Sequence, residues 1–160
     1  MKAKSLLLVL ALCFVASVTA QAATVIDEIK KIDDIATYHV PRFLIKNVMG
    51  MNDVFTQVIP GTDLTALRDI ESLDIIMVHK NKAKKKTRKL LERLADDPAY
   101  EVIFQAKKRD KKDTIVYGLP LSAEDYKEII VVVDEDDNIT IINVKGLLNV
   151  DRLNEAVPIE

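Results

Sequence analysis

The sequence predicts an α+β fold, a two-layer sandwich in which helices pack on one face of a largely antiparallel sheet. Two observations lead to this prediction. Apolar residues three and four positions apart, which are typical of amphipathic helices, occur mainly before residue 100, and β-prone stretches dominate after it. Several helices followed by four strands are typical of α+β domains rather than of alternating βα units. We therefore expect a single domain over residues 23–160, preceded by a leader over residues 1–22.

The first part of the domain is expected to contain a helix, a short strand and a second helix. Residues 24–35 place valine and isoleucine at helical spacing between charged residues. Residues 36–40 form a brief β-prone stretch. A proline then suits the first turn of a helix over residues 42–49, which would direct Phe43, Leu44 and Val48 towards the core.

The middle of the chain is expected to hold a loop, a strand and the most regular helix. Residues 52–63 contain a turn-forming Pro-Gly-Thr-Asp sequence, and a helical turn follows over residues 64–70. Residues 73–79 form a strand candidate. Residues 82–96 have leucines at helical spacing and end before Asp97 and Pro98, a pair that stops a helix.

The last part of the domain is expected to be a run of four strands. Residues 100–106 and 114–119 are the first two. Residues 130–133 are all β-branched, which predicts a central strand buried on both faces. Residues 134–138 form a polar turn, and residues 139–144 pair back as a hairpin.

The leader has the organisation of a secretory signal peptide. Lys2 and Lys4 give a positive start, an apolar stretch runs from residue 6 to residue 20, and Ala20 and Ala22 are the small residues that a signal peptidase requires. The apolar stretch is shorter than the ~20 residues that span a bilayer as a helix. We therefore expect cleavage near Ala22 and export to the periplasm or the cell surface.

Cysteine usage agrees with export and argues against a lipid anchor. Cys13 is the only cysteine and lies within the apolar stretch of the leader. A lipoprotein signal has a small residue before its cysteine, whereas Leu12 stands here. The cleaved domain would contain no cysteine, so its core must stabilise it without disulfides, which suits a bacterial envelope.

The charge balance argues against nucleic acid as a partner. Removing Lys2 and Lys4 changes the formal net charge of the chain from −2 to −4. A mildly acidic domain is not expected to bind nucleic acid through bulk electrostatics.

Seven positive charges within ten residues are the strongest local signal for a binding site. They can bind a polyanion, such as an acidic glycan, lipopolysaccharide phosphate or an anionic membrane surface. Cations near a helix N-terminus oppose its macrodipole by about 0.3–1 kcal/mol, which favours a functional reason for them. A solvated helix face explains the same run without any function, and the sequence leaves both interpretations open. The residues are Lys80, Lys82, Lys84, Lys85, Lys86, Arg88 and Lys89.

A second basic cluster lies between two predicted strands, at residues 107–109 and 111–112. Asp110 and Asp113 offset part of its charge, as in a charged hairpin loop. The two basic segments would form one larger surface if the fold placed them on the same face, which the sequence alone does not determine.

The sequence contains no motif for catalysis or metal binding. His39 and His79 are the only histidines, and each lies in a predicted strand. Residues 134–138 resemble the start of a calcium loop, but Ile139 and Lys145 occupy the positions at which such a loop needs glycine and glutamate. We therefore predict no catalytic residues, no metal site and no cofactor.

Three segments carry a family resemblance. They are the strand-to-helix junction TYHVPRFL at residues 37–44, the strand, lysine-rich helix and strand over residues 73–106, and the terminal hairpin that continues into residues 144–153. Over residues 26–153 the chain resembles domain of unknown function 4252, a family of small exported envelope proteins of Bacteroidetes-type bacteria. The resemblance implies an envelope location and brings no catalytic or binding residues. Many members look like lipoproteins, a pattern from which the leader described above departs.

We therefore expect an exported, non-enzymatic binding or protein-interaction module. Its partner would be an unknown envelope protein or glycan, and contact with a membrane surface stays open, as does the oligomeric state. The first alternative is a binder of polyanions or anionic membranes that uses residues 80–89. The second is an envelope enzyme with an unrecognised carboxylate site, for which Glu101, Glu124 and Asp125 are dispersed candidates.

Overall fold

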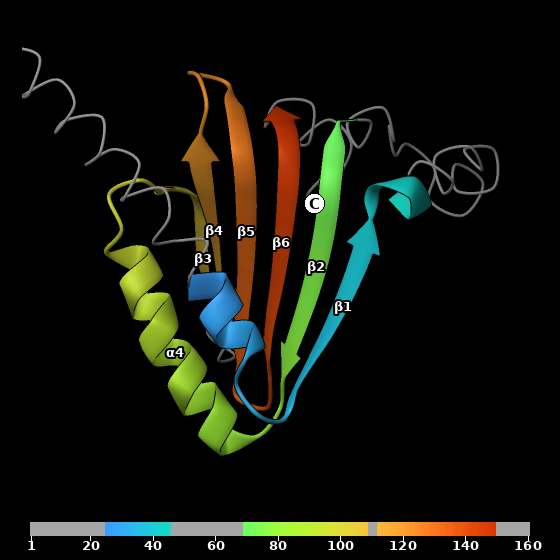
Figure 1. Ribbon diagram of the computed structural model, residues 1–160. Coiled ribbons are helices and arrows are strands. Elements are labelled where there is room, and N and C mark those ends of the chain that lie inside the picture. The colour runs from blue at the N-terminus through green and yellow to red at the C-terminus, as the bar shows by residue number, and fades with distance from the viewer. Residues whose placement is uncertain (1–24, 46–68, 109–111, 150–160) are drawn as a thin grey trace, which may run out of the picture.

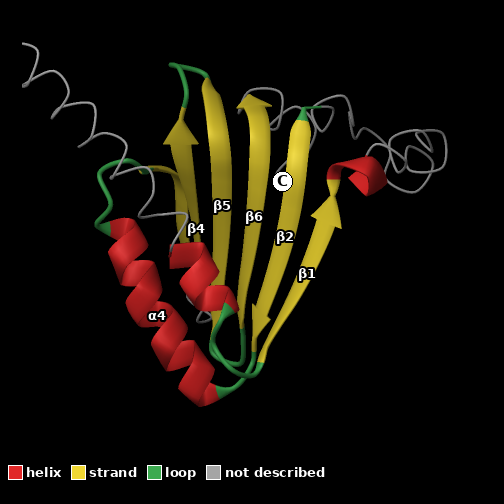
Figure 2. Ribbon diagram, viewed as in Figure 1, coloured by secondary structure: helices red, strands yellow, loops and turns green. Residues whose placement is uncertain are grey.

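The structure, a computed structural model, describes residues 25–45, 69–108 and 112–149 of the chain (Figure 1). Strands and one long helix make up most of these residues, and shorter helices occupy residues 25–30 and 42–45 (Figure 2). The labelled elements are β1 (Ile35–Pro41), β2 (Ile70–Val78), α4 (Asn81–Ala95), β3 (Glu101–Lys108), β4 (Lys112–Pro120), β5 (Asp125–Glu135) and β6 (Ile139–Asn149).

The described strands form a six-stranded sheet in the order β1-β2-β6-β5-β4-β3. Every neighbouring pair among them is antiparallel, so the prediction of an antiparallel sheet in an α+β fold is confirmed. Strands β3 to β6 follow one another as a meander. Strands β1 and β2 pair with each other and join the meander through β6.

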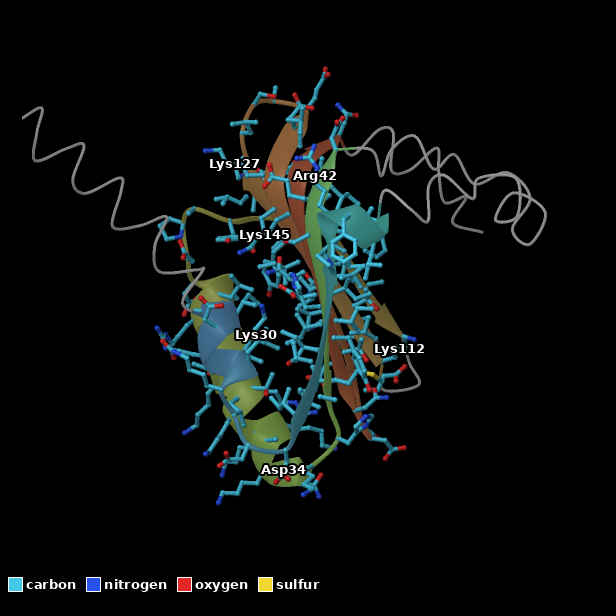
Figure 3. The ribbon with its side chains drawn as sticks, turned by 45° about the vertical axis from the view of Figure 1, so that its right-hand side comes forward. Lys30, Asp34, Arg42, Lys112, Lys127 and Lys145 are labelled. Carbon is cyan, nitrogen blue, oxygen red and sulfur yellow. The ribbon has the colours of Figure 1, made fainter. Side chains whose placement is uncertain are left out.

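One apolar cluster lies between the sheet and two helices. Alternate residues of a strand point to opposite faces, and Ile130 and Val132 of β5 belong to this cluster. Ile29 of helix 25–30 and Leu94 of α4 are completely buried in it. Helix 25–30 and α4 therefore contact the same cluster, and Figure 3 shows both beside the sheet.

The opposite face of the sheet carries a second apolar cluster. Ile129 and Val131, which alternate with residues of the first cluster along β5, belong to it, as does Ile45 of helix 42–45. The described helices are therefore divided between two clusters, which differs from the expectation that helices pack on one face. Val131 and Val133 are half-buried, so β5 is central in the sheet but is not fully buried on both faces.

The first helix is shorter than predicted. It ends at residue 30 and a turn follows, whereas the apolar spacing predicted a helix to residue 35. Asp34 has a φ of 68°, in the left-handed region that aspartate tolerates better than most residues. Its Oδ1 accepts a hydrogen bond from Lys80 Nζ at 2.5 Å. Strand β1 then begins at Ile35, which the apolar pattern had assigned to the helix.

Helix 42–45 does not bury the residues that the sequence suggested. Phe43 and Leu44 are 62% and 42% exposed, and Ile45 is buried instead, so this part of the prediction was wrong. The rest of the predicted helix, at residues 46–49, lies outside the described residues.

The predicted loop at residues 52–63 also lies outside the described residues, as does most of the helical turn predicted at residues 64–70. Ile70 itself is the first residue of β2.

The other predicted elements exist, and several strands are longer than expected. Helix α4 differs from its predicted bounds by one residue at each end, and Asp96 is its C-cap. Strand β5 begins at Asp125 rather than at residue 130, and β6 ends at Asn149 rather than at residue 144. The added residues mix apolar side chains with Asp, Lys, Glu, Gly and Asn, which have low β-propensity, so pairing with neighbouring strands contributes to their conformation.

Candidate functional site

Three residues of the basic run attach α4 and its N-cap to other parts of the chain. Arg88 donates two hydrogen bonds to Asp134, from Nε to Oδ2 at 2.9 Å and from Nη2 to Oδ1 at 2.8 Å. These bonds raise the pKa of the Arg88 guanidinium. Lys84 is buried, and its Nζ donates to the backbone carbonyl of Asp136 at 2.6 Å. Together with Lys80, which holds the turn before β1, these side chains have a structural role.

The other four lysines of the run form an exposed row, called the lysine stripe below. Positions three, four and seven apart lie on the same side of a helix. None of these lysines forms an ion pair with a described residue. The first turn of α4 contains no acidic residue, and its N-cap makes no side-chain hydrogen bond, so neither compensates these charges locally. The stripe consists of Lys82, Lys85, Lys86 and Lys89.

The described part of the second basic segment is used differently. Lys112 forms an ion pair with Glu135 at 2.9 Å. Figure 3 shows Lys112 on the side of the sheet away from α4, so it does not extend the lysine stripe. Lys107 is exposed on the edge strand β3, opposite Asp113 of β4, and residues 109–111 lie outside the described residues.

A groove of about 320 Å³ lies between α4 and strands β4 and β5. This volume is at the lower end of the range for small-molecule pockets, roughly 300–1,000 Å³. Burial raises the pKa of the Tyr117 hydroxyl in the groove, and this hydroxyl makes no hydrogen bond with a described residue. The floor of the groove is formed by the buried or half-buried residues Leu91, Ile115, Tyr117 and Val132, and the exposed Ala95 lines its edge.

Charged side chains form the rim of this groove. Asp113 and Asp134 stand directly opposite each other on β4 and β5, a pairing that sequence reasoning missed. Arg88 neutralises Asp134, whereas Asp113 has no ion pair with a described residue. Like charges at opposite positions destabilise a sheet, so a positive partner for Asp113 would be favourable. Glu92 adds a third carboxylate to the rim.

A buried ion pair connects helix 25–30 with strands β1 and β2. Asp74 Oδ2 accepts a hydrogen bond from Lys30 Nζ at 2.8 Å, and Asp74 Oδ1 lies 2.6 Å from His39 Nδ1. The Asp74 side chain is 7% exposed, against 27% for Lys30. Burial by itself would raise the pKa of the Asp74 carboxyl. The hydrogen bonds and charges of Lys30 and His39 outweigh burial and hold this pKa below its ordinary value.

Polar side chains extend this buried ion pair along the sheet. Asn143 is opposite Asp74, and both polar atoms of its buried amide lack a hydrogen-bond partner among the described residues. Glu128 Oε2 accepts a hydrogen bond from the Tyr100 hydroxyl at 2.5 Å, and Lys145 Nζ is 3.9 Å from the other carboxylate oxygen. Burial, together with Glu128, raises the pKa of Tyr100. The unpaired polar atoms are suited to hold ordered water.

Sequence reasoning did not single out these buried polar residues. The available signal was a carboxylate within an otherwise apolar strand, such as Asp74 in β2. Two of the carboxylates suggested for an enzyme have other partners, because Glu101 accepts a hydrogen bond from the Tyr126 hydroxyl and Asp125 accepts one from the Asn149 amide.

Within the described ranges, no group of three or more His, Cys, Asp or Glu side chains is arranged to hold a metal ion. The turn that resembles a calcium loop instead provides two acceptors for α4, the Asp134 carboxylate and the Asp136 carbonyl. None of the helices in residues 25–45, 69–108 and 112–149 is long and apolar enough to cross a membrane.

The described fold defines an α+β protein built on an antiparallel six-stranded sheet, with a basic helix and a small apolar groove beside it. Residues 30–156 match the family model described as domain of unknown function (DUF4252). Because this match covers most of the sequence, the chain belongs to the DUF4252 family, and the resemblance stated from the sequence is confirmed. No curated protein matches the chain.

Proposed function

We propose that this protein is an exported, non-enzymatic binding module of the cell envelope and that its lysine stripe binds an acidic glycan. The family is one of unknown function, so the proposal depends on residues of this chain. The lysine stripe is the observation that carries it.

Some basic side chains of the run bond other parts of the protein, and the others do not. Arg88 holds the helix against the end of β5, Lys84 bonds the turn after it, and Lys80 contacts Asp34 in the turn before β1. The four stripe lysines have no such contact among the described residues, and like charges three and four residues apart repel one another on a helix. The repulsion among the four lysines therefore destabilises the helix slightly. A role in binding an anionic partner would explain why they are present.

The geometry of the stripe suits an extended polyanion. Residues 82 and 89 are about 10 Å apart along the axis of a regular helix. A rigid row of ammonium groups over that length can contact successive carboxylate, sulfate or phosphate groups of a polymer at the same time. Because the domain as a whole is negatively charged, a polyanion would be attracted to the lysine stripe and repelled by much of the remaining surface.

The N-terminal sequence supports the proposed location. Its two lysines, apolar stretch and small residues at positions 20 and 22 are the parts of a signal peptide.

Neutralising two stripe lysines is expected to weaken polyanion binding about tenfold or more, because each lysine near an anionic surface contributes about 1 kcal/mol. The variant is Lys85→Gln/Lys89→Gln. Binding would be measured as the salt concentration needed to elute the protein from immobilised heparin, beginning at about 50 mM salt, where exposed charges are weakly screened.

The matched control is Lys112→Gln/Lys127→Gln, which changes the net charge by the same amount at positions away from the outer side of α4 (Figure 3). It should elute close to the unmodified protein. Equal loss in both double variants would show that only bulk charge matters, and an unmodified protein that is not retained would exclude the glycan proposal. Retention on anionic vesicles but not on heparin would assign the stripe to a membrane surface instead.

Export is tested on the N-terminus of the purified protein. Expression in a bacterial host is expected to yield a periplasmic chain that begins at Ala23, as determined by intact mass and N-terminal sequencing. The variant Ala22→Leu, which removes the small residue at the cleavage site, should retain the leader, whereas Ala23→Ser should be processed normally. An unprocessed chain in the cytosol would contradict the proposal.

A further inference from the structure

The groove between α4 and strands β4 and β5 is separate from the lysine stripe. Of the α4 residues, the groove uses Arg88, Leu91, Glu92 and Ala95, none of which belongs to the stripe. The proposed glycan contact therefore leaves the groove unexplained.

The floor of the groove is suited to an apolar group. Leu91, Ile115 and Val132 give it aliphatic walls, and Tyr117 adds the face or edge of an aromatic ring. Removing apolar surface from water is the main source of affinity in pockets of this size. The ligand therefore needs an apolar body of a few carbon atoms.

The rim determines the charge of the ligand. The two hydrogen bonds from Arg88 occupy both oxygens of Asp134, so this pair leaves no unpaired charge. Asp113 and Glu92 remain as carboxylates without an ion pair to a described residue. Lys107 faces Asp113 across the β3–β4 ladder, but it is exposed and does not reach ion-pair distance.

The Tyr117 hydroxyl provides a second polar contact. It has no hydrogen-bond partner among the described residues, and the Tyr117 side chain lines the groove. A hydroxyl accepts a hydrogen bond from an ammonium group as readily as it donates one. Tyr117 and Asp113 lie on the same face of β4, separated by Ile115.

We propose that the groove binds a primary amine carried on an apolar body, with the ammonium group at Asp113 and the body on the floor below it. The ammonium compensates the carboxylate that stands opposite Asp134, and it donates further hydrogen bonds at the rim. The apolar body covers Ile115, Val132 and the ring of Tyr117. An amine-bearing small molecule fits the volume of the groove.

The test uses three probes with the same six-carbon body and different heads: hexylamine, 1-hexanol and hexanoate. Binding to the purified protein would be measured by chemical-shift changes of backbone amides around the groove. Hexylamine is expected to bind about tenfold more tightly than either other probe, with a detectable effect below about 10 mM. The difference should shrink at high salt, because the rim is exposed.

Two variants test the assigned roles. Asp113→Asn is expected to lower the affinity for hexylamine about fivefold and to leave 1-hexanol unchanged. It also removes a like-charge pair, so it should not lower the melting temperature. Ala95→Leu adds a larger side chain at the edge of the groove and should weaken the binding of all three probes. The control Asp137→Asn removes one charge from an exposed turn residue that does not line the groove.

Three results would overturn the proposal. The first is hexanoate binding as tightly as hexylamine, which would assign the groove to anions through Arg88. The second is an unchanged hexylamine affinity in Asp113→Asn. The third is the absence of shifts around the groove at about 10 mM hexylamine. None of these results bears on heparin binding by the lysine stripe, so the two proposals can fail separately.

Discussion

Replacing Leu94 by alanine is expected to destabilise the protein by about 2–5 kcal/mol. The Leu94 side chain is completely buried in the first apolar cluster and fixes the C-terminal half of α4 to the sheet. Alanine would lose the burial of these carbon atoms and leave a cavity that the neighbouring side chains fill only in part. The free energy of unfolding would be measured by urea titration, as a lower midpoint with an unchanged slope.

The control for this variant is Leu121→Ala. Leu121 is 50% exposed, so its truncation should cost less than about 1 kcal/mol. If Leu94→Ala has an effect as small as that of the control, α4 does not depend on this contact for its position. The lysine stripe and the groove would then need another explanation of how they are held in place.

Replacing Asp74 by asparagine is expected to cost about 1.5–3 kcal/mol at pH 7, because it leaves the half-buried Lys30 ammonium without its charged partner. The side chain keeps its shape, so the loss comes from the charge and its hydrogen bonds to Lys30 and His39. Adding Lys30→Met to this variant removes the unpaired charge and should restore part of the stability. The exposed turn residue Asp137 provides the control variant Asp137→Asn.

The Asp74 contribution should depend on pH in a defined direction. The folded pKa of Asp74 is lowered, so in the acidic range the unfolded chain binds more protons than the folded one, and stability rises with pH. The contribution is complete above the unfolded pKa of about 3.9 and is lost as the pH falls through the folded value. Urea titrations from pH 7 to pH 3 should show the difference from Asp74→Asn shrinking below about pH 4. A difference that stays constant over this range would contradict the assignment.

Local patterns were sufficient for the elements whose signals lie within a few residues. Helix α4 was predicted to within one residue at each end, because apolar spacing and Pro98 both act locally. The β-branched core of β5 was also recognised from sequence. The start of β5 and the end of β6 were missed, because apolar residues alternate irregularly with charged residues and glycine there and their strand conformation depends on pairing with distant residues.

The end of the first helix shows how a distant contact overrides a local pattern. Ile32 and Ile35 continue the helical spacing, yet the chain turns after residue 30. Asp34 takes the left-handed conformation, and Ile35 pairs with Val78 of β2 instead of continuing the helix. No pattern within residues 24–35 contains that information.

The sequence predicted the basic residues of the candidate site, but not which side chains contact one another. The sequence identified the basic run, but the positions of Asp134 and Asp136 determine which cations become structural anchors. Similarly, Asp113 and Asp134 lie far apart in sequence, and the register of β4 with β5 makes them opposite neighbours. Register cannot be read from either strand alone.

The strand order also decides when the sheet can be completed. Strand β2 meets the meander only through β6, the last described strand of the chain. If the protein is exported as proposed, a chain that passes through the translocon with its N-terminus first would expose the residues of β1 and β2 before those of the meander. These two pieces share no described strand pairing until residues 139–149 follow. The order of the strands would therefore delay closure of the sheet until the end of passage, when the whole chain can fold at once.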